Sequence, residues 1–190
     1  MIFVTVGMHN QGFDRLIKKC DLIAGETDEK MIMQKGCTSY CPENAESFDF
    51  ASYEEILSLI RRSRVVITHD GAGSILNCLL NKKITVVVPR LKEFNECKYE
   101  NKLDLALELE KQNKIHLIRD IDLLNLKLIE DLTTIGMMGD SKAIGRMEDS
   151  KAIGMMEDSK TIGMMEDSKT IENFESKNNL LINIKKYIKI

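Results

Sequence analysis

The fold of this chain is decided by the stretch Val65-Val66-Ile67-Thr68-His69-Asp70-Gly71-Ala72-Gly73-Ser74-Ile75-Leu76. An apolar, β-branched run ends at polar residues, and two glycines follow. After them comes a set of apolar residues at helical spacing, expected on one helix face: Ile75, Leu76, Leu79 and Leu80. This order predicts a strand, a tight loop and the N-terminus of a helix.

The predicted loop and helix N-terminus suit a phosphate or diphosphate group. Glycines let the backbone approach a ligand closely, and the first N–H groups of a helix lack intrahelical acceptors and carry partial positive charge. Ser74 is placed either to cap the helix or to donate a hydrogen bond to the anion. The alternative interpretation is a loop whose glycines serve only steric needs.

Strand patterns and helical patterns alternate along the rest of the chain. We predict further strands at 2–6, 30–34, 47–50, 84–88 and 115–118, and further helices at 13–24, 53–62, 103–112 and 121–132. Ser52 and Glu55 form a capping box at the start of the second of these helices. The alternation predicts an α/β fold, a Rossmann-like parallel sheet with right-handed crossovers and flanking helices.

Three segments are predicted to meet at one edge of this sheet. Gly7 follows the first strand, segment 68–74 lies at the end of the central strand, and Pro89-Arg90 ends the strand after it. Because ligands of parallel sheets bind beyond the carboxyl ends of the strands, we expect these segments to converge on one cleft. Residues 91–100 are expected to form a loop.

On the first helix, four charged residues are expected to face water: Asp14, Arg15, Lys18 and Lys19.

The charge balance argues against a nucleic-acid partner. The 190 residues include 27 Lys and Arg against 30 Asp and Glu, a net charge of −3, whereas non-specific nucleic-acid binding needs a basic surface. The length suits one α/β domain. Neither a secretory signal nor a run of about 20 apolar residues is visible, which predicts a cytoplasmic protein, soluble or held peripherally at a membrane through a partner.

The five cysteines are odd in number and scattered. Cys20 and Cys78 fall on apolar helix faces, where buried thiols are expected, and Cys97 stands alone. Cys37 and Cys41 have no second pair and no nearby histidine to complete a zinc site. The sequence therefore predicts free thiols and no metal site.

A nine-residue repeat begins at Ile135 and recurs from Ile144, Ile153 and Ile162, with a decayed copy from Ile171. A period of nine places successive isoleucines on opposite faces of a helix or a strand, and each full unit carries a glycine. Neither element therefore gains one continuous apolar face.

We predict that residues 135–170 are an insertion, mobile or partly helical, without chemistry of its own. The alternative is that its methionines bind a partner. The domain itself is then formed by 1–134 together with 171–190. The apolar and lysine-rich end of the tail is expected to pack on the domain or on a partner subunit, with a membrane surface as the alternative.

Two sets of motifs resemble a known family. One is His69-x-Gly71-x-Gly73-Ser74, followed by a helix, a strand and Pro89-Arg90. The other is Val4-Thr5-Val6-Gly7 followed by Phe13-Asp14-Arg15-Leu16-Ile17. Together they resemble the C-terminal, donor-binding domain of glycosyltransferase family 28, and the second set is similar to the small Alg13/PssE-like subunits of two-component enzymes.

The resemblance implies a single GT-B C-terminal-type domain, which is one half of an enzyme whose active site closes between two domains. It implies transfer of a sugar, GlcNAc-like or a uronic acid, from a UDP-sugar to a lipid-linked saccharide acceptor. The implied partner is an Alg14/PssD-like membrane-associated subunit. No cofactor is implied beyond the UDP-sugar donor substrate, and the fold has no obligatory metal.

The resemblance also implies a set of donor-binding residues. The diphosphate would be cradled by Gly7, His69, Gly71, Gly73 and Ser74. The nucleoside and the sugar would lie near Asn77, Asn101 and Lys102, and Met8, Ala72 and Arg90 complete the set. No catalytic residue is implied. His9 lies in the same loop as Gly7, where it either contacts the ligand or is merely solvated.

This chain departs from the family pattern at several polar positions. Asn77 stands where relatives often have a Glu that holds nucleoside hydroxyls, and an amide accepts less strongly than a carboxylate. Similar replacements occur at Met8, Cys97, Asn101, Lys102 and Asp104. The replacements at Asn77, Cys97, Asn101 and Lys102 favour an alternative function, a non-catalytic partner or regulatory subunit that has lost donor binding. A third hypothesis is an unrelated nucleotide-binding α/β protein.

Overall fold

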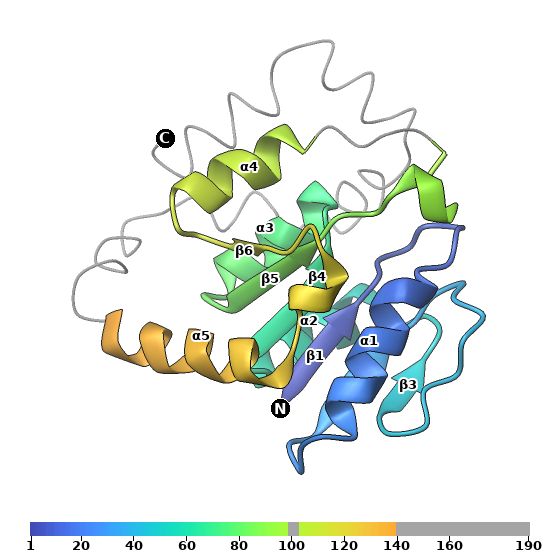
Figure 1. Ribbon diagram of the computed structural model, residues 1–190, viewed down its shortest axis with the longest axis horizontal. Coiled ribbons are helices and arrows are strands. Elements are labelled where there is room, and N and C mark those ends of the chain that lie inside the picture. Colours follow the sequence, from blue (N-terminus) through green and yellow to red (C-terminus); the bar gives the residue numbers. More distant parts are fainter. Residues whose placement is uncertain (99–102, 140–190) are drawn as a thin grey trace. The chain divides into compact units, whose positions relative to one another are not determined.

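Six parallel strands form one sheet in the computed structural model, which describes residues 1–98 and 103–139 (Figure 1). The order is β3-β2-β1-β4-β5-β6. The strands are β1 Ile2–Thr5, β2 Met31–Gln34, β3 Glu46–Phe48, β4 Val65–His69, β5 Ile84–Val88 and β6 His116–Leu117. β1, β4 and β5 are central and almost wholly buried, as expected for apolar runs covered on both faces. The predicted parallel α/β sheet is confirmed.

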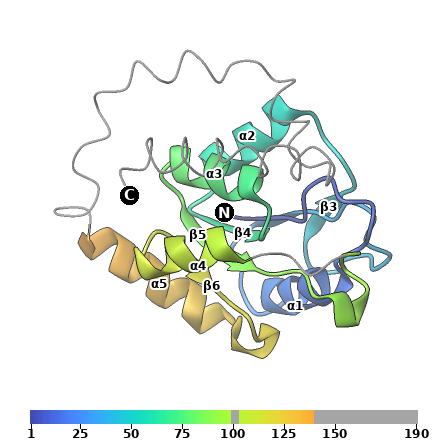
Figure 2. The same ribbon diagram turned by 90° about the horizontal axis from the view of Figure 1, so that it is seen from above.

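Helices cover both faces of the sheet (Figure 2). The α-helices are α1 Asp14–Ala24, α2 Tyr53–Arg62, α3 Ala72–Leu80, α4 Asp104–Lys111 and α5 Leu126–Gly139, and the 3-10 turns are η1 Lys92–Phe94 and η2 Ile121–Leu123. Alternate strand residues point to opposite faces. Val4 and Ile67 pack in a core with α1 and α5, whereas Phe3 and Val66 pack with α2 and α3.

A local signal in the sequence places the N-terminus of α2. The capping box at α2 is present, since Ser52 Oγ accepts from the Glu55 amide and the Glu55 carboxylate accepts from the Ser52 amide. Cys20 and Cys78 are buried as predicted, and burial raises the pKa of the Cys78 thiol to about 12. Both thiols are therefore protonated and inert at neutral pH.

Two details of the predicted turn and helix at 71–80 differ in the structure. α3 begins at Ala72 with Gly71 as its N-cap residue, so Ser74 lies inside the first turn and does not cap the helix. On that helix Ile75 and Cys78 are buried while Leu80 is exposed. The segment 91–98 after β5 is a loop, as predicted, and contains the short turn η1.

The helix predicted from residue 121 begins later. The turn η2 comes first, and the side chain of Asn125 accepts a hydrogen bond from the Leu128 amide at 2.9 Å. This is the contact of an N-cap residue, and it starts α5 at Leu126. Within the described residues, no helix is both long and apolar enough to cross a membrane.

Some predictions lie outside the described residues. These are the placement of Asn101 and Lys102, the repeat beyond Gly139 and the tail 171–190. The described residues all belong to one unit, Met1–Met147.

A carboxylate and guanidinium pair ties the segment before β2 to the segment before β4. Glu29 Oε1 accepts from Arg64 Nε at 2.7 Å, and Arg64 Nη2 pairs with the second carboxylate oxygen. Arg64 also donates to Thr133 on α5. These hydrogen bonds from Arg64, opposed by partial burial, lower the pKa of Glu29 from 4.5 to about 2.

Glu29→Gln is expected to lower the free energy of unfolding at pH 7 by about 2 kcal/mol. Because the pKa of Glu29 is lower in the folded protein than in the unfolded chain, its stabilising effect is complete above pH 4.5 and is lost as the pH falls toward 2. Urea denaturation of both proteins between pH 7 and pH 2 measures the difference. The exposed Glu26→Gln is the control, and a Glu29 effect that does not shrink with acid would contradict the assignment.

Candidate functional site

The candidate site lies at the carboxyl ends of β1, β4 and β5. The strands are in register, with Thr5 opposite Thr68 and Thr68 opposite Val87, so the three strands end at nearly the same level. The loop 6–13, the turn that opens α3 and the loop 89–98 therefore meet at this edge. The predicted convergence of these three segments is confirmed.

His69 occupies the centre of this edge, and its side chain is buried. Its Nδ1 accepts from the Gly71 amide at 3.0 Å, and its Nε2 lies 3.1 Å from Ser74 Oγ. Burial lowers the pKa of His69 to about 3, and the positive charge of Arg90 adds to the effect. The imidazole is neutral at pH 7, with Nδ1 as acceptor and the proton on Nε2 donated to Ser74.

This arrangement orients the Ser74 hydroxyl. Ser74 Oγ accepts from His69 Nε2, so its own proton is available to a second acceptor outside this pair. Ser74 lies in the first turn of α3, where the N–H groups have no intrahelical acceptor. A directed hydroxyl and a helix N-terminus together suit an anion.

The loop glycines have two different roles. A Cβ on Gly7 would lie 2.3 Å from His69 Nε2, and a Cβ on Gly71 would lie 2.1 Å from His69 Cε1. Both residues are thus required to be small by the imidazole packed against them, and Gly7 also has a φ of +72°. A Cβ on Gly73 would meet nothing within 4 Å. Of these three glycines, only Gly73 faces open space.

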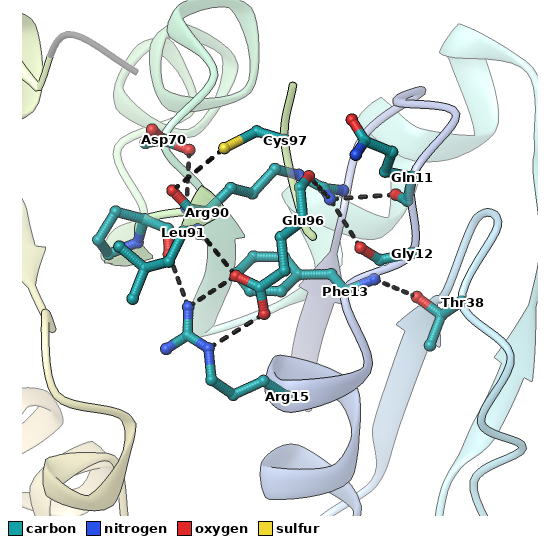
Figure 3. A network of polar contacts seen from close by, with 11 residues as sticks. Gln11, Gly12, Phe13, Arg15, Thr38, Asp70, Arg90, Leu91, Glu96 and Cys97 are labelled. Atoms are coloured by element: carbon teal, nitrogen blue, oxygen red, sulfur yellow. Dashed lines mark hydrogen bonds and ion pairs between the residues drawn. The ribbon is translucent and has the colours of Figure 1, made fainter. Parts of the chain in front are cut away.

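Arg90 holds the loop after β1 in place (Figure 3). Its side chain is buried and lies over the Phe13 ring, with the guanidinium carbon 4.7 Å from the ring centroid. The guanidinium donates at 2.9–3.1 Å to four backbone carbonyl oxygens, those of Val6, Gln11, Gly12 and Glu96. The geometry assigns Arg90 a role in loop architecture, and its direct contact with a ligand stays a prediction.

Arg15 and Glu96 belong to the same network. Arg15 Nε and Nη2 donate to the two carboxylate oxygens of Glu96 at 3.0 and 2.9 Å. The expectation that Arg15 faces water is therefore wrong, because its side chain is only 12% exposed. The two residues are 81 positions apart, so no spacing in the sequence signals their contact.

His9 lies in the same loop as Gly7 and is half-buried. Its Nδ1 accepts from the Gln11 amide at 3.1 Å. Burial lowers the pKa of His9, and the charges of Arg90 and Lys98 lower it further. His9 is thus neutral at pH 7 and carries its proton on Nε2. Lys98, which the sequence prediction omitted, places a cationic side chain close to this loop.

The remaining predicted site residues within the described part of the chain are Met8, Ala72 and Asn77. Met8 is 57% exposed, with its sulfur 4.0 Å from Gln34 Nε2. The side-chain oxygen of Asn77 accepts from the Tyr53 hydroxyl at 3.2 Å, and Ala72 is the first residue of α3. No group of three or more His, Cys, Asp or Glu side chains within residues 1–98 and 103–139 is arranged to hold a metal ion.

A parallel sheet with flanking helices, and with a glycine-containing turn and a helix N-terminus at its carboxyl edge, defines a Rossmann-like α/β domain. The sequence matches the model of the glycosyltransferase family 28 C-terminal domain over residues 1–160. The chain belongs to this family. No curated protein matches it at a significant level.

Two solved glycosyltransferase structures align with most of this chain, and the first of them shares the fold. The glycotransferase of kitacinnamycin aligns with a TM-score of 0.53 at 17% identity, over 74% of this chain and 35% of that one. The glycosyltransferase SnogD from Streptomyces nogalater aligns with a TM-score of 0.44 at 13% identity, over 74% of this chain and 37% of its own. The present chain thus spans little more than a third of the length of either enzyme.

Proposed function

We propose that this chain is the UDP-sugar-binding subunit of a two-component GT-B glycosyltransferase. The observation that carries the proposal is the open N-terminus of α3, where Gly73 faces free space beside a Ser74 hydroxyl oriented by neutral His69. A donor diphosphate bound there would accept from the first amides of α3 and from Ser74.

The proposed reaction is transfer of a sugar from UDP to a hydroxyl of the acceptor. The acceptor oxygen forms the new bond to the anomeric carbon, the bond to the donor phosphate breaks, and UDP leaves with the bonding electron pair. Negative charge grows on the diphosphate in this step, and the N-terminus of α3 stabilises it. We place the general base on the partner, because His9 and His69 each accept a backbone N–H at Nδ1 and carry their proton on Nε2.

The matching family model describes a C-terminal domain, and we place the other half of the active site on a second component. In our proposal this component is an Alg14/PssD-like membrane-associated subunit that binds a lipid-linked saccharide. The complex would act on the cytoplasmic side of a membrane, with this chain held there through its partner. The sugar is GlcNAc-like or a uronic acid.

Gly73→Asp is expected to abolish UDP binding while the protein stays folded. The new side chain fits, since nothing lies within 4 Å of the Cβ position, and a carboxylate in the first turn of a helix is stabilising by about 0.3–1 kcal/mol. The same carboxylate would occupy the space of the diphosphate and repel it. Calorimetric titration with UDP and UDP-GlcNAc, alone and with the candidate partner, measures the loss.

Gly73→Ala is the matched control, because it adds bulk without charge. It should weaken UDP binding much less than Gly73→Asp. If wild type binds UDP and Gly73→Asp binds it equally well, the donor diphosphate does not lie at α3.

A second candidate function is a non-catalytic subunit that keeps the fold and has lost donor binding. The hydrogen bond from Tyr53 to Asn77 favours it, because the Asn77 oxygen that would accept from a nucleoside hydroxyl is already engaged. Absence of UDP binding by wild type even with the partner present would select this candidate.

A further inference from the structure

We propose that Glu96 is a positioning residue that locks the loop after β5 to the loop after β1 and so sets the geometry of the candidate site. The expected effect of Glu96 on the affinity for UDP rests on the proposed function. The coupling of the two loops is a property of the chain alone and is measured without any ligand.

The contacts of Glu96 join three parts of the site (Figure 3). Its carboxylate receives Arg15 Nε and Nη2 from α1, at 3.0 and 2.9 Å. The same carboxylate receives the Leu91 amide at 2.9 Å, and the backbone oxygen of Glu96 receives Arg90 Nη1 at 2.9 Å. One residue therefore binds α1, its own loop and the guanidinium that holds the loop 6–13.

Arg15 anchors the Glu96 carboxylate to helix α1. It lies in the first turn of α1, a helix whose Leu16 and Ile17 are fully buried in the core. Its guanidinium contacts two aromatic rings, Phe13 at 5.4 Å and Phe94 at 5.2 Å, and it also donates to the Pro89 carbonyl at 2.8 Å. A two-pronged guanidinium and carboxylate contact in a buried setting defines both distance and orientation.

The loops joined in this way carry charged and polar residues of the candidate site. Lys98 lies two residues beyond Glu96, and its charge acts on His9 in the other loop. The amide of Arg90 donates to Asp70, directly before the turn that opens α3, at 3.3 Å. A shift of the Glu96 carboxylate would therefore move Lys98, His9 and Asp70 relative to one another.

Glu96 holds loops and not the apolar core. Its side chain is buried, and the partners of its carboxylate are the Arg15 guanidinium and the Leu91 amide at the carboxyl edge of the sheet. Its loss should therefore loosen the site while β1 and β4 keep their pairing. This separates a positioning role from a general role in folding.

Glu96→Gln tests the proposal, with Glu93→Gln on the exposed turn η1 as the matched control. Amide hydrogen exchange of the ligand-free chain should rise at Leu91 and across the loop 6–13 in Glu96→Gln, and stay at the wild-type level in β4. The affinity for UDP should fall about tenfold or more in Glu96→Gln and remain unchanged in the control. Unchanged exchange in the loop 6–13 would overturn the proposal.

The double variant Arg15→Met/Glu96→Leu guards against simple unfolding. Replacing both partners of a buried charge pair by apolar residues of similar size often preserves stability. We expect a melting temperature close to wild type, with fast exchange in both loops and weak UDP binding. A double variant with wild-type loop protection would show that the pair positions nothing. If wild type itself does not bind UDP, the proposed function fails while the exchange measurements still decide the role of Glu96.

Discussion

Gly71→Ala is expected to lower the free energy of unfolding by about 3 kcal/mol. The added methyl group would lie 2.1, 2.8 and 3.0 Å from three atoms of the His69 ring. The ring has no room to retreat, since it is buried and Gly7 lies against it from another loop. Relief therefore requires the turn to move, which also breaks the hydrogen bond from the Gly71 amide to His69 Nδ1.

Chemical denaturation of three variants measures this effect. Gly73→Ala, two residues along the same turn, meets open space and should be neutral or slightly stabilising. The double variant His69→Ala/Gly71→Ala removes the ring that the methyl group strikes. It should be less destabilised than the sum of its two single variants, as expected of directly contacting residues. Equal stability of Gly71→Ala and Gly73→Ala would contradict the packing described for His69.

These glycines show how far the sequence predicts the site. The order of strand, turn and helix is local, so hydrophobic periodicity is enough to place Gly71 and Gly73 at the start of α3. The ring that constrains Gly7 and Gly71 belongs to His69, and its packing against Gly7 depends on which strands become neighbours. The sequence pattern does not specify that β4 lies beside β1, and so the steric cause of Gly7 emerges only from the fold, whereas Gly71 lies two residues from His69 in the same turn.

The contact between Arg15 and Glu96 cannot be predicted from the sequence for a related reason. Arg15 follows the expected pattern of a water-facing helix residue, and nothing in its helical spacing distinguishes it from Lys18 or Lys19. Its partner Glu96 lies in a segment without periodicity. By contrast, the capping box of Ser52 and Glu55 spans only four residues, and it was predicted correctly because both partners are local.

The largest loss of stability is expected from Arg90→Met, about 3–5 kcal/mol. Methionine retains an apolar stem that can lie over Phe13, but it has no hydrogen-bond donor. The backbone carbonyl oxygens of Val6, Gln11, Gly12 and Glu96 would each lose the guanidinium N–H that now satisfies them. Leaving a buried acceptor unsatisfied costs about 1–3 kcal/mol, and water reaching the loosened loop would recover part of the total.

Urea denaturation of Arg90→Met measures this loss, with Arg62→Met as the control variant. Arg62 is exposed at the end of α2, so its replacement should change stability by less than about 0.5 kcal/mol. Arg90→Lys should recover only part of the loss, because a single ammonium cannot reproduce the planar fork that reaches carbonyls of both loops. If Arg90→Lys is as stable as wild type, a positive charge at this position is enough to hold the loop after β1. Full loss with lysine and methionine alike would instead show that the geometry of the guanidinium holds the loop after β1, and with it Gly7 against His69.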